Sequence, residues 1–300
     1  MHILITGATG LIGTALIKQL RNQHAITVLT RNPGNAYHRL GHDVRAIDSL
    51  AQLEHLDEFD AVINLAGEPI AGKRWSARQK ERIEQSRFQI TEQLVQLCLR
   101  SNQPPAVFIS GSAIGYYGRQ GTTPVTESSY QAHDEFTHRL CAKWEAIAKQ
   151  AQSAQTRVCL LRTGIVLAPN GGALTKMAMP FKWGVGGPIA DGQQMMSWIH
   201  IDDMVAAIIF LLEHDAVHGA VNATAPQPVT NEEFSETLAN VLSRPCAMRV
   251  PALVMRTMMG EMADMILTGQ AVLPERLEAQ GFQFRHPTLE DALRHCYPTA

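Results

Sequence analysis

Residues 1–14 read MHILITGATGLIGT, in which Gly7, Gly10 and Gly13 recur at a spacing of three residues. An apolar run at residues 3–5 precedes these glycines, and apolar residues at helical spacing follow them. Glycines between a strand and a helix let the backbone bend sharply and approach a pyrophosphate, whose charge is stabilised at the helix N-terminus. The stretch therefore predicts a dinucleotide-binding turn. An ordinary glycine-rich turn is the alternative interpretation.

Strand-like and helix-like segments alternate over the first half of the chain. Helical spacing of apolar residues is found at residues 79–99 and again after residue 136, whereas the loop-like residues 32–42 predict no regular element. This alternation is typical of an α/β fold with a doubly wound parallel sheet, which binds its ligand at the carboxyl ends of the strands. Further strands are expected at residues 25–30, 44–47, 61–66, 106–110 and 157–162.

The character of the sequence changes after residue 168, where glycines and prolines interrupt an apolar stretch. We therefore expect a Rossmann-like nucleotide-binding domain over residues 1–168, with returning strands and helices at about 197–225. A smaller mixed region is expected over residues 169–196 and 226–300, forming the substrate side and a C-terminal annex. Within it, Thr230 is predicted to cap a helix at residues 231–242, with Glu233 as its capping-box partner.

The end of the second expected strand carries Thr30 and Arg31 and no acidic residue. In a dinucleotide fold this position faces the adenosine ribose, where an acid binds the 2′-hydroxyl and an arginine suits a 2′-phosphate. The sequence therefore predicts NADP(H) rather than NAD as the cofactor. The alternative is a solvated arginine at a strand end.

Composition excludes several other classes of protein. The net charge is −2 and basic residues do not cluster, which argues against a nucleic-acid partner. The five cysteines are far apart, and His214 and His218 lack the sequence context of a zinc-binding helix, so neither a disulfide framework nor a metal site is predicted. No signal peptide or membrane span is visible, so we expect a cytoplasmic protein that does not bind membranes. We expect it to be a monomer or a homodimer.

These motifs together resemble the extended short-chain dehydrogenase/reductase superfamily, and more narrowly its atypical "epimerase family protein" branch, whose activities are largely unassigned. The C-terminal residues, including LPER at 273–276, resemble the short domain of unknown function that ends proteins of that branch. The supporting segments are TGATGLIG at residues 6–13, NLAGEPI at 64–70, SGS at 110–112, YG at 117–118, LRTG at 161–164 and WIHIDD at 198–203.

The resemblance implies a set of cofactor contacts. It places the pyrophosphate at Gly7, Thr9, Gly10, Leu11 and Ile12, and the 2′-phosphate and adenine side at Thr30 and Arg31. It places the adenosine and the nicotinamide-side ribose beside Leu65, Ala66 and Gly67, and the nicotinamide end beside Ser110 and Val166. Arg87 stands where relatives often have an asparagine, and it is expected to reach the cofactor in place of a missing lysine.

The missing lysine belongs to the Tyr-x-x-x-Lys pair that supplies acid/base chemistry in ordinary members of the superfamily. No tyrosine here is followed by lysine four residues later. Alignment on Glu145 puts Thr137 at the tyrosine position and Cys141 at the lysine position. Lys143 falls on a different face of the expected helix, so it does not replace the lysine.

Two residues are candidates for the remaining chemistry. Ser112 matches the serine whose hydroxyl polarises a substrate oxygen in relatives, although it could also serve loop geometry alone. Tyr117, or its neighbour Tyr116, could donate a proton if a positive charge such as Arg87 lowered its pKa from about 10. His200 is interpreted as a turn residue within reach of substrate.

Three functional hypotheses follow from these residues. The first is an NADP(H)-binding epimerase-like or oxidoreductase-like enzyme that acts on an unidentified small molecule. The second is a non-catalytic NADP(H)-binding sensor or scaffold. The third is a binding module that has lost the nucleotide.

Overall fold

A central parallel sheet organises the molecule. The computed structural model describes residues 1–298, and every neighbouring pair of strands in this sheet is parallel. The strand order reverses between β1 and β4, which confirms the Rossmann-like, doubly wound prediction; in such folds the ligand crevice lies at the carboxyl ends of the strands at this point. Across the sheet the strands are β11 (Gly219–Ala223), β7 (Arg157–Thr163), β5 (Val107–Ala113), β4 (Ala61–Asn64), β1 (His2–Thr6), β2 (Ala25–Leu29) and β3 (Arg45–Ile47).

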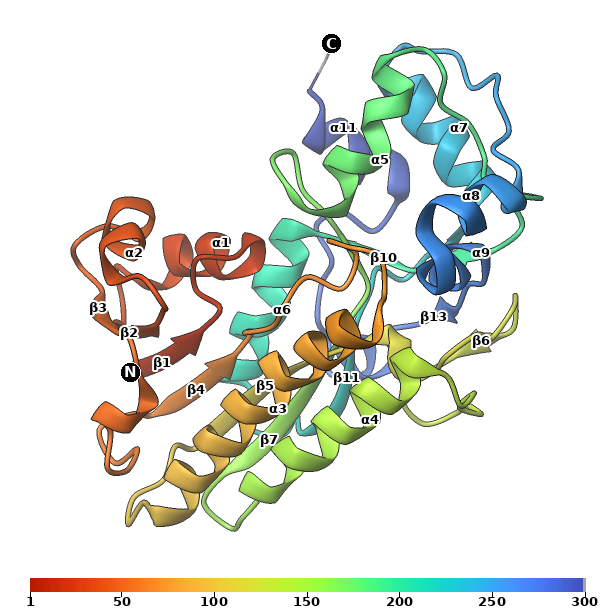
Figure 1. Ribbon diagram of the computed structural model, residues 1–300. Coiled ribbons are helices and arrows are strands. Elements are labelled where there is room, and N and C mark those ends of the chain that lie inside the picture. Colours follow the sequence, from red (N-terminus) through yellow and green to blue (C-terminus); the bar gives the residue numbers. More distant parts are fainter. Residues whose placement is uncertain (299–300) are drawn as a thin grey trace.

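Helices cover both faces of this sheet (Figure 1). Alternate strand residues point to opposite faces, so Ile3 and Ile5 pack with one helix layer while Leu4 packs with the other. The first layer contains α1 (Leu11–Leu20), α2 (Pro33–Leu40) and α6 (Ile201–Glu213), and the second contains α3 (Ala77–Arg100) and α4 (Phe136–Ala148). No helix within residues 1–298 combines the length and the apolar character needed to cross a bilayer.

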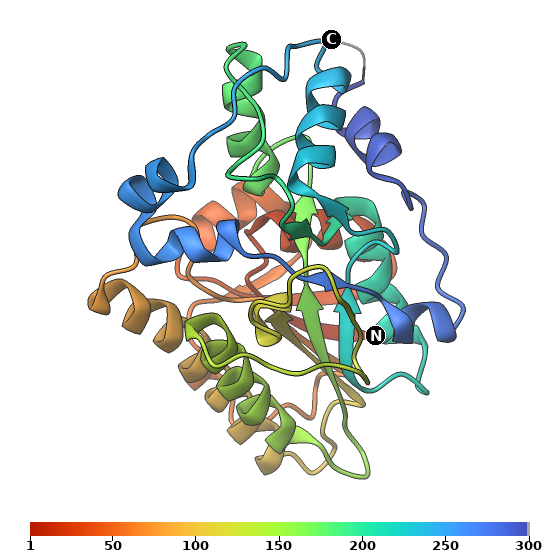
Figure 2. The ribbon, with the colours of Figure 1, turned by 90° about the vertical axis from the view of Figure 1, so that its right-hand side faces the viewer.

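A second, smaller core lies beyond the sheet, on the side towards which the strand arrows point (Figure 2). It is built around Trp198 and Phe234 and draws on both segments expected to form the annex. Leu277 and Phe282 of the last segment instead pack in the main core. The predicted domain boundaries therefore stay a prediction. The helices of the smaller core are α5 (Gly172–Lys182), α7 (Asn231–Val241) and α11 (Leu289–Cys296).

Short elements complete the described chain. Three two-stranded pairings join β8 (Ile165–Leu167) to β10 (Trp198–His200), β9 (Met195–Met196) to β12 (Val229–Thr230), and β6 (Pro124–Val125) to β13 (Ala271–Val272), all within residues 1–298. The other helices are α8 (Ala252–Met259), α9 (Asp264–Leu267) and α10 (Glu275–Ala279), with 3-10 turns at Leu50–Gln52, Ile114–Tyr116, Lys149–Ala151 and Gly260–Ala263.

One expected loop is a helix. Residues 32–42 contain α2, so the loop prediction was wrong. The side chain of Asn32 accepts a hydrogen bond from the backbone N–H of Asn35 at 3.0 Å, and Pro33 is the first helical residue. This is a favourable helix start, which the polar composition concealed. The predicted cap at Thr230 is confirmed, because its hydroxyl accepts from the N–H of Glu233 at 3.1 Å.

A buried ion pair fastens α4 to β7. The guanidinium of Arg162 donates to both carboxylate oxygens of Glu145, at 2.8 and 2.9 Å, and the two side chains are only 3% and 1% exposed. Burial opposes the charge on Arg162, but the hydrogen bonds and charge of Glu145 outweigh it, so the pKa of Arg162 lies above its usual value. Each of these buried charged groups therefore needs the other as its counter-charge in the folded protein.

Glu145→Gln should lower the free energy of unfolding by about 3–5 kcal/mol, because it leaves a buried guanidinium without its counter-charge. Glu290→Gln is the matched control, since Glu290 also accepts two hydrogen bonds from an arginine, Arg294, but both of those side chains are more than half exposed. Its expected cost is below about 1 kcal/mol. Denaturant unfolding measures both values, and equal losses would contradict this account.

Candidate functional site

The glycine turn has the geometry that the sequence predicts. Gly7 has a φ of +70°, and a Cβ there would lie 2.6 Å from the carbonyl carbon of Leu65. A Cβ on Gly13 would lie 2.5 Å from the carbonyl oxygen of Gly7. Gly10 occupies the N-cap of α1 and has no side chain to cap the first-turn N–H groups. The turn therefore brings the start of α1 close to β4 and presents backbone amides at the carboxyl edge of the sheet.

A hydrogen-bonded chain fixes the neighbouring strand end. The hydroxyl of Thr6 donates to Asn64 Oδ1 at 2.6 Å and accepts from the backbone N–H of Ala66 at 3.1 Å. The amide of Asn64 donates in turn to Thr91 Oγ1 on α3, at 2.8 Å. Residues 65–67 are held across from the glycine turn in this way, and each is at least partly exposed. Their predicted position beside a nucleotide is compatible with this geometry.

Thr30 and Arg31 lie between the end of β2 and the start of α2. The Thr30 hydroxyl donates to the carbonyl of Asn32 at 3.4 Å, and the side chain of Arg31 is exposed. No acidic residue occupies this strand end. The two residues therefore stand where the sequence analysis expects an adenosine 2′-phosphate.

The two residues expected at the nicotinamide end differ in exposure. Val166 is half-buried in β8. Its carbonyl oxygen and the side chain of Leu11 both lie next to Gly172, because a Cβ on that glycine would be within 4 Å of each. Ser110 is fully buried in β5, where it pairs with Asn64 and Leu160 of the flanking strands. The structure thus gives the predicted lining role of Ser110 no support, and that role stays a prediction.

On α4 the positions of the usual acid/base pair hold Thr137 and Cys141. The Thr137 hydroxyl donates to Glu135 Oε1 at 3.1 Å. Burial raises the pKa of Cys141 to about 12, so its thiol stays protonated at neutral pH and is a poor nucleophile. The ammonium of Lys143 lies 4.7 Å from the ring centroid of Phe88 on α3, and its predicted failure to replace the missing lysine stays a prediction.

Arg87 lies beside this altered position. Its guanidinium is 5.2 Å from the ring centroid of Trp144 and donates to the backbone carbonyls of Glu68 and Ile83, each at 3.0 Å. A Cβ on Gly67 would lie 2.9 Å from the guanidinium carbon, so the arginine borders the segment expected to flank the cofactor. Burial lowers the pKa of Arg87. The location agrees with the predicted cofactor contact.

Ser112 and Tyr117 belong to the network around the buried ion pair. The Ser112 hydroxyl donates to Glu145 Oε1 at 2.8 Å. Tyr117 is fully buried, donates to Asn222 Oδ1 at 2.7 Å and accepts from Arg162 at 3.0 Å. Burial raises the pKa of Tyr117 to about 12, although Arg162 acts against this shift. A proton-donor role for Tyr117 therefore has no support here and stays a prediction.

The alternative tyrosine, Tyr116, is half-buried and its ring lies 3.5 Å from the guanidinium carbon of Arg162. Burial raises its pKa to about 12, so neither tyrosine is poised as a base. Arg162 and Asn222 were not predicted as parts of this site. Both lie on strands among apolar neighbours, where their polarity was a signal, and Arg162 also belongs to the LRTG segment at residues 161–164.

Comparisons with known proteins agree with this geometry. The model of the NAD dependent epimerase/dehydratase family matches residues 3–223, and a domain of unknown function (DUF1731) matches residues 250–296. The Arabidopsis thaliana "Epimerase family protein SDR39U1 homolog, chloroplastic" is 40% identical over 303 residues, covering 98% of this chain and 86% of its own length. An epimerase family protein of Staphylococcus aureus is 36% identical, with 97% of each chain covered.

Solved structures extend the likeness to the whole fold. The human epimerase family protein SDR39U1 (isoform 2), crystallised with NADPH, superposes with a TM-score of 0.92 at 35% identity and full coverage of both chains. A UDP-glucuronic acid 4-epimerase from Bacillus cereus, in complex with NAD, has a TM-score of 0.78 at 16% identity over 99% of this chain and 98% of its own, which shows the shared fold alone. The chain therefore belongs to the NAD-dependent epimerase/dehydratase family, in the epimerase family protein branch that carries the C-terminal domain of unknown function.

Proposed function

We propose that the chain binds NADP(H) at the crevice between β1 and β4 and acts as an epimerase-like or oxidoreductase-like enzyme on a small molecule. The observation that carries the proposal is the combination of a turn in which Gly7 and Gly13 have no room for a side chain with Arg31 at an end of β2 that holds no acidic residue. The similar human protein was crystallised with NADPH, which supports the same choice of cofactor.

The residues present fit such a cofactor. Side chains at Gly7 or Gly13 would clash with backbone, so the turn keeps its amides accessible to a pyrophosphate. The positive charge of Arg31 suits a 2′-phosphate. Arg87 lies next to Gly67, in the segment after β4 that we expect to flank the cofactor. When bound, the nicotinamide supplies reversible hydride exchange with a substrate carbon. The pyrophosphate contacts would come from Gly7, Thr9, Gly10, Leu11 and Ile12, and the contacts to the 2′-phosphate and adenine side from Thr30 and Arg31. Leu65, Ala66 and Gly67 would flank the adenosine and the nicotinamide-side ribose.

On the substrate side, Ser112 is the residue we expect to bind the reacting oxygen. Glu145 accepts the hydrogen bond of its hydroxyl, and Arg162 holds Glu145 in one orientation through two further bonds. A hydroxyl held by such a rigid network is preorganised to exchange its hydrogen bond for one to a substrate. The lysine that normally assists here is replaced by a protonated thiol, so any proton transfer must follow a different route.

A second candidate function is a non-catalytic NADP(H)-binding sensor or scaffold. The observation in its favour is that Cys141, at the usual lysine position, stays protonated, and that Tyr117, the alternative proton donor, is held between Asn222 and Arg162. In this case the redox state of the bound cofactor would change the affinity for a protein partner. Turnover of NADPH with any carbonyl substrate separates the two functions.

Arg31→Ala should weaken NADPH binding by about 10- to 100-fold, because a charge-assisted bond to the 2′-phosphate is worth about 1.5–3 kcal/mol. NADH, which lacks this phosphate, should bind as it does to the wild type. Calorimetric titration measures both affinities. Arg78→Ala, which removes an exposed arginine at the start of α3, should leave both unchanged. An equal loss for the two cofactors would exclude our assignment of the 2′-phosphate site.

Ser112→Ala should lower turnover by about 10²–10³-fold, the usual cost of removing one preorganised hydrogen-bond donor, and leave NADPH affinity unchanged. The assay follows NADPH absorbance across a panel of aldehydes and ketones, first with the wild type. Ser129→Ala, at an exposed site, is the matched control and should keep full turnover. A wild type that binds NADPH tightly but oxidises it with no member of the panel would contradict an oxidoreductase-like enzyme and favour the sensor.

A further inference from the structure

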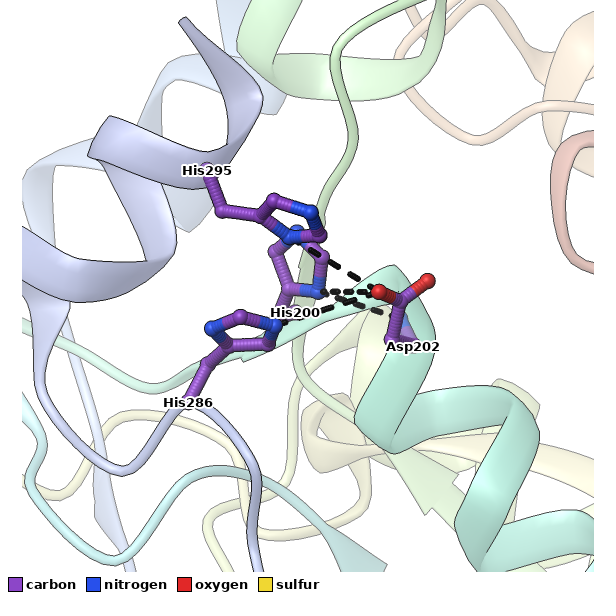
Figure 3. Close-up of side chains that lie close together, drawn as sticks. All are labelled: His200, Asp202, His286 and His295. Atoms are coloured by element: carbon purple, nitrogen blue, oxygen red, sulfur yellow. Dashed lines mark hydrogen bonds and ion pairs between the residues drawn. The ribbon is translucent and has the colours of Figure 1, made fainter. Parts of the chain in front are cut away.

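Four side chains of metal-ligand type gather at the start of α6 (Figure 3). His200 and Asp202 come from the junction of β10 and α6, whereas His286 precedes α11 and His295 lies in its last turn. One potential ligand atom from each residue lies within 4.8 Å of all the others. The fold thus joins two distant parts of the sequence, which is why the sequence analysis predicted no metal site.

The three imidazoles converge on one carboxylate oxygen. His200 Nδ1 and His286 Nε2 each lie 3.8 Å from Asp202 Oδ2, and His295 Nδ1 lies 3.7 Å from it. These distances are too long for hydrogen bonds. Two ligands of a tetrahedral zinc ion, each about 2.0–2.1 Å from the metal, are about 3.3–3.4 Å apart. Movements of less than an ångström would therefore bring the oxygen and the three nitrogens around one ion.

A hydrogen bond to Asp291 fixes the orientation of the His286 ring. Its Nδ1 donates to Asp291 Oδ2 at 2.6 Å, which leaves the lone pair on Nε2 facing Asp202. The carboxylate of Asp203 accepts the backbone N–H groups of Arg285 and His286, at 2.7 and 3.0 Å, and holds this segment against α6. A histidine whose far nitrogen is bonded to a carboxylate is the usual arrangement around a bound metal.

His200 is the buried member of the cluster. Its side chain is 2% exposed, Nδ1 accepts the backbone N–H of Asp202 at 3.1 Å, and Nε2 has no hydrogen-bond partner within residues 1–298. Protein contacts thus satisfy this ring only in part. Binding a metal through Nδ1 would replace one cap hydrogen bond of α6 by a coordinate bond. Asp202 and His295 are 41% and 53% exposed, which gives an ion access from solvent.

We propose that His200, Asp202, His286 and His295 bind one zinc ion per chain. Three imidazoles and one carboxylate suit zinc, whereas magnesium and calcium prefer oxygen ligands. Four protein ligands fill a tetrahedral zinc shell, so the site is structural and not catalytic. The ion fastens the segment from His286 to α11 onto the start of α6. This inference does not depend on the proposed enzymatic function.

The test is a calorimetric titration of the chelator-treated, dialysed protein with Zn²⁺, with the ion content of the product measured by mass spectrometry. The wild type should bind one zinc ion per chain and melt at a higher temperature with zinc than without it. His295→Gln and His286→Gln should weaken zinc binding by at least about 10-fold and lose the rise in melting temperature. His218→Gln, which removes an exposed histidine outside the cluster, should behave as the wild type.

Asp291→Asn adds a test that leaves all four ligands in place. It should weaken zinc binding by about 10- to 100-fold, because it removes the carboxylate that orients His286. NADPH binding serves as the folding control for every variant. Zinc binding of equal strength in the wild type, His286→Gln and His295→Gln would overturn the proposal, and so would a wild type that takes up no zinc.

Discussion

The candidate functional site depends on a buried ion pair whose loss would strongly destabilise the fold. Arg162 on β7 and Glu145 on α4 neutralise each other out of contact with water, and each also holds a neutral partner, Tyr117 and Ser112 respectively. Because an unpaired buried charge is strongly destabilising, Arg162 and Glu145 must stay paired whenever the protein is folded. Ser112 lies in β5 opposite Arg162 of β7, and its hydroxyl is oriented by the bond to Glu145 of this ion pair.

The nucleotide crevice is positioned by residues other than this ion pair, beside a helix α4 whose usual acid/base positions are altered. The glycine turn and the Thr6–Asn64 hydrogen bonds position the crevice through β1 and β4, and α4 joins this network through Trp144, whose indole N–H donates to Thr91. The lysine position on α4 could therefore become the buried Cys141 with no effect on the cradle. Arg87 of α3 supplies a positive charge close to that position, although its hydrogen bonds to backbone carbonyls fix it in place.

The sequence predicted those structural features that are determined by residues close together in the chain. The glycine turn, the alternation of strands and helices, and the cap at Thr230 depend on neighbouring residues, and the structure confirms them. The helix α2 was missed because its residues are polar, although Asn32 and Pro33 carried a local start signal. The partners of Arg162, and the meeting of His200 with His286, depend on elements far apart in the chain, and no spacing rule records such contacts.

Asn222 connects the two regions of the chain that match separate family models. Its side chain accepts from Tyr117 and donates to the carbonyl of Leu273, and Val272 packs against Tyr117 in a small shared core. The two regions that match separate family models therefore share interior contacts at the site itself. Loss of the C-terminal region would expose the side chains of Asn222 and Tyr117, which it now covers, to water. Selection should thus keep the two regions together as one heritable unit, and substitutions on either side of this contact should be correlated in evolution.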